Sequence, residues 1–178
     1  MKLVIIESPF AKSIDDSREN NLRYARSAMR DCLLRGESPY ASHLLYTQDG
    51  VLDDDIPEER TLGIDAGLDW GSCAEASVIY IDRGISSGML YGIKNAIKKG
   101  REREYRSLPE FSLLPCKLKT LKSGDYFFYK LTGMVGIVVS VESDSVNVPT
   151  SIRVVAETLE GSKILFSPDE LVFHIPLL

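Results

Sequence analysis

The sequence predicts an α/β fold, namely a doubly wound parallel sheet followed by a small all-β module. Over about the first 108 residues, apolar runs alternate with segments of helical periodicity in the order β-α-β-α-β-α-β, which is typical of a parallel sheet covered by helices. After residue 116 the pattern changes to short strands without helices, which is typical of a small barrel. We therefore expect an α/β domain over 1–108, a linker over 109–116 and a β-barrel module over 117–178.

The first elements are predicted from apolar runs and helix boundaries. Residues 2–6 form an apolar run that ends at a turn signal, which predicts a buried, central strand. Residues 20–34 carry apolar side chains at helical spacing and end before Gly36, which predicts a helix. After the break at Pro39, residues 41–47 (ASHLLYT) predict the second strand.

The rest of the α/β domain follows the same alternation. Pro57, followed by two glutamates, is a typical first helical residue and predicts a helix over 57–70. Residues 77–81 predict the third strand, 89–99 a helix that ends at a glycine, and 103–108 the fourth strand.

The C-terminal part predicts five short strands in roughly seventy residues, which favours a barrel of the SH3-like kind over an extension of the α/β sheet. These strands are expected at 125–131, 135–141, 152–158, 163–166 and 171–175.

Composition excludes several classes of protein. The net charge is −5, whereas a nonspecific grip on nucleic acid requires a basic face. The basic stretch at 98–103 is interrupted by Glu102 and is interpreted as a solvated helix end. Three widely spaced cysteines and two histidines fit neither a disulfide framework nor a metal site, and no segment resembles a signal peptide or membrane span. We expect a cytoplasmic protein with no cofactor, no metal, no nucleic-acid partner and no membrane partner.

In an open parallel sheet, ligands bind in a crevice outside the carboxyl ends of the strands. We therefore expect the residues directly after the first three strands to converge on one site. From the sequence pattern, the candidate ligand-binding residues are Glu7, Ser8, Phe10, Ser42, His43, Tyr46, Gln48, Arg60, Asp82, Gly84, Ile85, Ser86, Ser87, Gly88 and Met89.

The turn after the third strand is the strongest part of this set. Gly84 and Gly88 permit a close approach of the backbone, while Ser86 and Ser87 can cap the following helix. Free amides at this turn would suit a phosphate. The alternative is that the glycines and serines serve turn and capping roles alone.

Polar groups along residues 42–48 need a partner or a pocket in a strand that is otherwise buried. For His43 alone, a structural histidine is the alternative to a catalytic one. Residues 53–55 (DDD) are interpreted as a solvated acidic loop rather than a metal site, because consecutive positions cannot all face one ion. Arg60 is expected to pair locally or to meet an anionic ligand.

Several segments together resemble the nucleoside 2-deoxyribosyltransferase-like fold, and within it a family common in bacteriophage genomes. The resemblance covers about residues 2–108, and the β module lies outside it. It rests on VIIESPF, the helix with Asn21 and Tyr24, RGESPYASHLLYTQ, VLDDDIPEER and DRGISSGMLYGIKNA. It adds Asn21 and Tyr24 to the candidate ligand-binding residues.

The resemblance also bears on catalysis. In the transferases, a glutamate of a Gly-Thr-x-x-Glu segment attacks the anomeric carbon of the sugar. Aligning that segment with residues 88–92 places Gly92 at the nucleophile position. The resemblance therefore implies a pocket without the transfer chemistry, unless Glu7, Asp65 or Asp82 has taken over as the catalytic carboxylate. It also implies a homodimer or a higher homo-oligomer.

Three hypotheses follow. The first is a phage-type protein that binds a nucleotide or ADP-ribose-like ligand without turnover. It would sequester a host antiviral signal, such as a cyclic nucleotide or cyclic ADP-ribose, in the cytoplasm of the infected bacterium. The second is an N-glycosidase or deoxyribosyltransferase-like enzyme acting on nucleosides, nucleotides or NAD-derived compounds. The third is a non-catalytic scaffold for protein interactions.

Overall fold

The computed structural model describes residues 1–11, 17–108, 115–129, 132–143, 152–167 and 170–175. The chain divides into two compact units, one of Met1–Ile81 with Ile85–Leu108 and one of Asp82–Gly84 with Pro109–Leu177. In the part of the chain with described structure, no helix is both long and apolar enough to cross a membrane.

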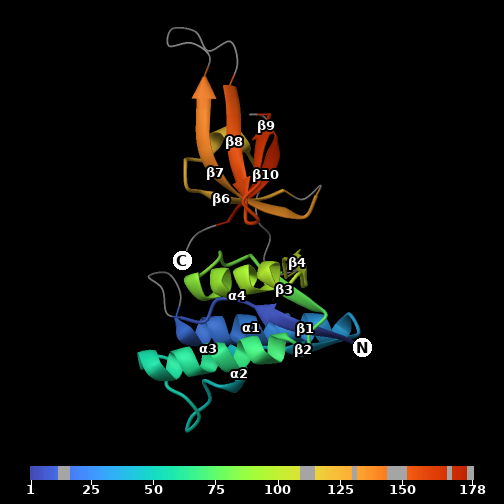
Figure 1. The fold of residues 1–178 in the computed structure, drawn as a ribbon, viewed down its shortest axis with the longest axis vertical. Coiled ribbons are helices and arrows are strands. Elements are labelled where there is room, and N and C mark those ends of the chain that lie inside the picture. The colour runs from blue at the N-terminus through green and yellow to red at the C-terminus, as the bar shows by residue number, and fades with distance from the viewer. Residues whose placement is uncertain (12–16, 109–114, 130–131, 144–151, 168–169, 176–178) are drawn as a thin grey trace. The chain divides into compact units, whose positions relative to one another are not determined.

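The first unit is built on a four-stranded parallel sheet (Figure 1). Its strands are β1 (Lys2–Glu7), β2 (Glu37–Tyr40), β3 (Ala76–Tyr80) and β4 (Glu102–Arg106). They lie in the order β2-β1-β3-β4, and every neighbouring pair is parallel. The predicted parallel sheet with a central first strand is therefore confirmed.

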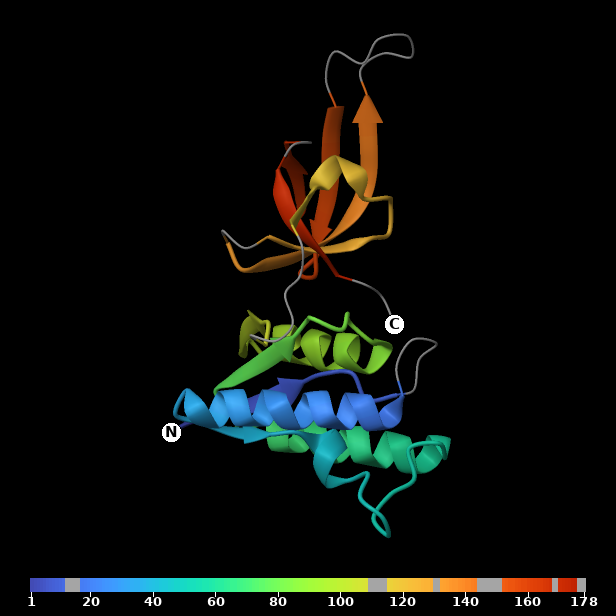
Figure 2. The ribbon, with the colours of Figure 1, turned by 180° about the vertical axis from the view of Figure 1, so that it is seen from behind.

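Helices cover both faces of this sheet (Figure 2). They are α1 (Arg18–Leu34), α3 (Pro57–Gly71) and α4 (Ser87–Lys98). The Tyr80 hydroxyl donates to the Ala28 carbonyl at 3.2 Å, so α1 packs on the face to which Tyr80 points. A Cβ built on Gly71 would lie 3.1 Å from Ile5 Cδ1, so α3 packs on the opposite face. All three helices begin and end within two residues of the predicted bounds.

The predicted second strand is wrong. β2 spans Glu37–Tyr40, and the segment expected to be extended contains a single helical turn, α2 (Ser42–Leu45). Gly36, with φ of 78°, turns the chain from α1 directly into β2. Because β2 is an edge strand, Pro39 can lie inside it without removing a ladder hydrogen bond.

The prediction of a solvated helix end at 98–103 is wrong for Arg101, which is only 8% exposed. Its guanidinium donates to Ser77 Oγ at 2.9 Å and to the Gly71 carbonyl at 2.6 Å. These hydrogen bonds join the end of α3 to β3, so Arg101 is a buried structural cation.

A second buried arginine links the two edge strands of the sheet. Arg106 donates to both carboxylate oxygens of Glu37 at 2.7 Å, and both side chains are almost fully buried. These hydrogen bonds hold the pKa of Glu37 below its usual range.

The second unit is an antiparallel sheet with one short helical turn. The five predicted strands are present as β6 (Tyr126–Tyr129), β7 (Met134–Ser143), β8 (Ile152–Thr158), β9 (Lys163–Phe166) and β10 (Leu171–Ile175). A sixth strand, β5 (Pro115–Lys117), lies where the linker was expected and leads into η1 (Leu118–Thr120). The strand order is β5-β10-β6-β7-β8-β9.

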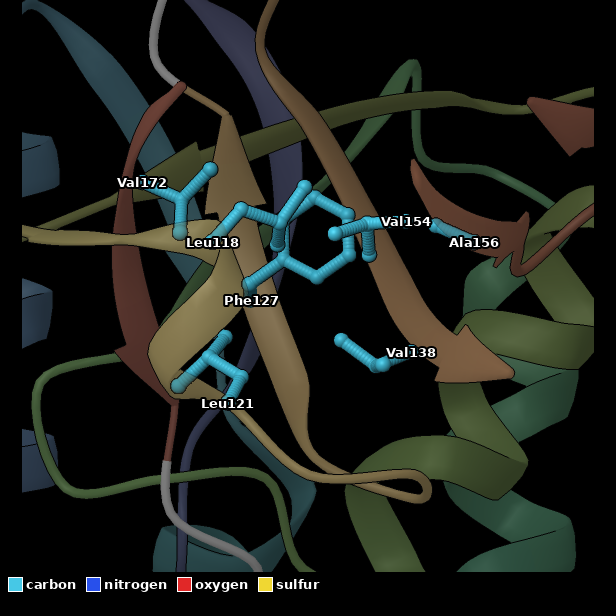
Figure 3. Packing of buried hydrophobic residues seen from close by; sticks show 7 residues of the cluster. All are labelled: Leu118, Leu121, Phe127, Val138, Val154, Ala156 and Val172. Atoms are coloured by element: carbon cyan, nitrogen blue, oxygen red, sulfur yellow. The ribbon is translucent and has the colours of Figure 1, made fainter. Parts of the chain in front are cut away.

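The core of the second unit surrounds Phe127 (Figure 3). The residues that contribute to it are Leu118, Leu121, Phe127, Val138, Val154, Ala156 and Val172. Val154 and Ala156 lie two residues apart on β8, as expected for a strand that buries one face. Closure as an SH3-like barrel stays a prediction, as does the start of this module at residue 117. Residues 130–131 of the first predicted strand lie outside the described residues.

Candidate functional site

The segments after β1 and β2 meet directly. Ser8 follows β1 and is 5% exposed, and its Oγ lies 2.9 Å from Nε2 of His43 in α2. The ring centroids of Phe10 and His43 are 6.0 Å apart. Burial lowers the pKa of His43 to about 4, so the imidazole is neutral at pH 7. A neutral imidazole offers one donor and one acceptor nitrogen.

The start of α1 holds the loop after β1 in place. Asn21 donates from Nδ2 to the carbonyls of Ala11 at 3.0 Å and Phe10 at 3.4 Å. The Arg18 guanidinium lies 5.3 Å from the centroid of the Phe10 ring. Asn21 was expected to contact the ligand, but its buried amide instead fixes the backbone that carries Phe10.

The N-terminus of α4 meets the start of α3. Ser86 caps α4, since its Oγ accepts from the Met89 amide at 3.3 Å. A Cβ built on Gly88 would lie 3.5 Å from Nη2 of Arg60, which forms an ion pair with Asp54. We call this place the Arg60 corner. It combines a guanidinium with the positive end of a helix dipole.

Glu7 ends β1 and packs against Gly92 of α4. A Cβ built on Gly92 would lie 2.6 Å from Oε2 of Glu7 and closer still to Oε1. Burial raises the pKa of Glu7 to about 8 against the opposing charge of Arg101, so the carboxyl is mostly protonated at pH 7. No described residue forms a hydrogen bond or an ion pair with this carboxyl.

Two hollows lie beside these groups. A small pocket of about 50 Å³ is lined by Ser42, His43, Tyr46 and Arg60, among others, and can hold only a few water molecules. An open groove of about 570 Å³ is lined by Phe10, Arg18, Thr47 and Gln48, together with carboxylates. The groove has the volume of a typical small-molecule site.

The charge of the groove restricts what it can bind. Its carboxylates are those of Asp49, Asp53, Asp54, Asp55 and Glu59, so we call it the acidic groove. Arg18, the basic side chain in its lining, forms an ion pair with Asp55 at 2.6 Å. Carboxylates accept hydrogen bonds from hydroxyl groups and repel phosphates. A phosphate is therefore disfavoured in the groove, and at the Arg60 corner it would compete with Asp54 for the guanidinium.

Some predicted site residues lie in the core instead. Tyr24 is 2% exposed and packs edge-on against Tyr80, with ring centroids 6.5 Å apart. Ile85 and Met89 are buried as well. These apolar side chains support the packing of α1 and α4 on the sheet.

Other predicted residues lie away from the Ser8 and His43 contact. Asp65 lines a different groove, next to Lys98 and Lys99 at the end of α4. Asp82 and Gly84 follow β3 but group with the second unit, so we do not assign them to the site. Ser87 is the exposed first residue of α4.

Sequence reasoning missed Asp54, Arg18 and Arg101 as neighbours of the site. Asp54 was interpreted as part of a solvated loop, but its side chain is 13% exposed and pairs with Arg60. A carboxylate six residues before an arginine at a helix start is the only local signal for this pair. The contact between Glu7 and Gly92 joins positions 85 residues apart and has no local signal.

The fold and these contacts define an α/β domain with a polar crevice at the carboxyl ends of its strands. The chain belongs to the family described as "Domain of unknown function (DUF7768)", whose model matches residues 2–106. Among solved structures, the chain is similar to a 2-deoxyribosyltransferase from Bacillus psychrosaccharolyticus, with 14% identity and a TM-score of 0.41 over 59% of this chain and 72% of that chain. A search of curated proteins found no match.

Proposed function

We propose that the α/β domain binds a nucleoside-type ligand in the crevice at the carboxyl ends of its strands. The observation that carries the proposal is the convergence of three segments. Ser8 contacts His43, Glu7 packs on Gly92, and Arg60 reaches the first turn of α4. Polar groups from separate segments that meet beside an open groove are typical of a ligand site.

Each part of a nucleoside has a matching surface. Phe10 lines the groove with 8% of its surface exposed and has the Arg18 guanidinium over its ring, so a base that stacks on Phe10 would take the place of this guanidinium. The carboxylates of the acidic groove can accept hydrogen bonds from sugar hydroxyls. A ligand that also carries a phosphate, such as a nucleotide or an ADP-ribose-like compound, would place it at the Arg60 corner. Binding without turnover would suit a protein that sequesters a nucleotide signal.

Calorimetry with a ligand panel tests this proposal. The panel contains adenosine, cytidine, thymidine, ADP-ribose, cyclic ADP-ribose and cyclic nucleotides. We expect at least one to bind, and Phe10→Ala to weaken that binding at least about tenfold through loss of stacking. Tyr91→Ala is the matched control, because Tyr91 is an exposed aromatic residue of α4. Arg60→Gln should weaken the binding of phosphorylated ligands alone. A flat response across the panel would refute the proposal.

The position of Glu7 favours a second function, cleavage of an N-glycosidic bond. The sequence resemblance implies that Gly92 stands at the position of the transferase nucleophile. The carboxyl of Glu7 packs against Gly92. In this reaction the protonated Glu7 would give its proton to the leaving base as the C–N bond breaks. Water would then add to the anomeric carbon and return a proton to Glu7. Release of free base from nucleosides or NAD, lost in Glu7→Gln, would support an enzyme. No release by chromatography would exclude cleavage of those compounds.

A further inference from the structure

We propose that a groove between the C-terminal ends of α3 and α4 binds a small zwitterion, such as a free α-amino acid, whose carboxylate pairs with Arg101. We call it the α3–α4 groove, and its volume is about 710 Å³. Its lining includes Glu75, which precedes β3, and Arg101, which precedes β4. It therefore lies at the amino ends of the strands, apart from the crevice at their carboxyl ends, and the inference goes beyond the proposed function.

The observation that carries the inference is a buried positive charge without a carboxylate partner. Arg101 lines the groove and is only 8% exposed. Its described hydrogen-bond acceptors are neutral, namely Ser77 Oγ at 2.9 Å, the Gly71 carbonyl at 2.6 Å and Asn95 Oδ1 at 3.5 Å. No described carboxylate, that of Glu7 included, forms an ion pair with it. Buried charges are normally paired, because removal from water is costly, and a ligand carboxylate would supply the partner.

The guanidinium of Arg101 also keeps hydrogen-bond donors for a ligand. A guanidinium has five N–H groups, of which each terminal nitrogen carries two. The described hydrogen bonds use one N–H of Nη1 and one of Nη2, so each terminal nitrogen keeps an N–H without a described acceptor. A carboxylate accepts from both nitrogens in the strongest arginine pairs. Lys98 and Lys99 add positive charge to the same wall.

The α3 side of the groove has the opposite charge. Asp65 and Asp69 line it one helical turn apart, and neither side chain forms an ion pair with another described residue. The C-caps of both helices, Ser72 and Lys99, also line the groove, so the negative ends of two helix dipoles lie there. These features favour an ammonium group and disfavour a phosphate dianion. A ligand with one carboxylate and one ammonium group matches both walls, and Leu68 offers an apolar surface for its side chain.

Isothermal titration calorimetry of the full chain with alanine, serine and leucine tests the inference. We expect at least one amino acid to bind with a dissociation constant below about 1 mM. Its N-acetyl derivative lacks the ammonium group and its amide lacks the carboxylate, so each should bind at least about tenfold more weakly. Asp69→Asn should weaken binding by about twofold to fivefold. Lys94→Gln, which changes an exposed lysine of α4 outside the groove lining, is the matched control and should keep wild-type affinity.

Arg101→Met removes the buried charge and should abolish binding. If this variant does not fold, the two derivatives and Asp69→Asn still test the site. In wild type, the saturating amino acid should shift the amide signals of Ser72, Asn95 and Gly100 in NMR spectra and leave those of Ser8 and His43 unchanged. The inference fails if none of the three amino acids binds, if either derivative binds as tightly as its parent, if Arg101→Met keeps wild-type affinity, or if the shifts appear at Ser8 and His43 instead. None of these results depends on nucleoside binding.

Discussion

Replacement of Gly92 by alanine tests the packing at the centre of the site. The new Cβ would lie 2.6 Å from Oε2 of Glu7 and closer to Oε1, so the carboxyl must move. The carboxyl is the end of a flexible side chain, and its displacement has a moderate cost. We expect the two positions to be energetically coupled.

The expected change in the free energy of unfolding on Gly92→Ala follows from two opposing effects. Alanine is favoured over glycine inside a helix by about 1 kcal/mol. Overpacking of a filled site costs about 1–3 kcal/mol. Gly92→Ala should therefore reduce the free energy of unfolding by roughly 0–2 kcal/mol in wild type. In a Glu7→Ala background the overlap is gone, and the same change should stabilise the protein by about 1 kcal/mol. The coupling energy is then about 1–3 kcal/mol.

Urea denaturation of wild type, both single variants and the double variant measures this coupling. Gly88→Ala is the matched control in the same helix, because a Cβ there would have no contact closer than 3.5 Å. It should combine additively with Glu7→Ala. If Gly92→Ala and Glu7→Ala also add to within about 0.5 kcal/mol, the proposed packing of Glu7 on Gly92 is refuted.

Three further predictions concern stability. Burial lowers the pKa of His43 to about 4 from its usual 6.5, so the folded domain should lose stability as pH falls through this window, by at most about 1.4 kcal/mol per pH unit. Urea denaturation at pH 7 and at pH 4.5 should show a smaller loss of stability for His43→Gln than for wild type. An equal loss in both proteins would contradict the lowered pKa of His43. Arg106→Met should lower the free energy of unfolding by about 3–5 kcal/mol, because it leaves Glu37 unpaired, and adding Glu37→Leu should restore part of that loss. A double variant that is less stable than Arg106→Met would contradict the ion pair. Gly67→Ala should destabilise the protein by about 1–3 kcal/mol in thermal unfolding, since the new Cβ would lie 2.8 Å from Cβ of Ser42. A gain in stability would show that α2 and α3 pack less closely.

The sequence was sufficient to predict the elements whose local pattern agrees with their packing. The 3.6-residue spacing in α1 and the proline at the start of α3 both reflect features of the final structure. The second strand could not be predicted in the same way. Only pairing with β1 determines that 37–40 is extended, and an edge position makes Pro39 acceptable there.

In the candidate site, too, some features could be predicted from local sequence and others depend on the tertiary fold. The sequence predicts that the segments containing Ser8 and His43 meet at one edge of the sheet. The two side chains are in contact, but His43 lies in α2 after β2 and not in the strand predicted for 41–47. The raised pKa of Glu7 depends on burial under α4, and the space for its carboxyl depends on the glycine at 92. Such contacts between distant positions arise from the tertiary fold, so periodicity and spacing do not reveal them.

The central claim is that the crevice at the ends of the strands binds the ligand. Amide chemical-shift mapping by NMR, with saturating adenosine or ADP-ribose, tests it most directly. We expect the largest shifts at Ser8, Phe10, His43, Gly88 and Gly92, and little change in strands β6 to β10. Shifts confined to the second unit, or none with either ligand, would contradict the account.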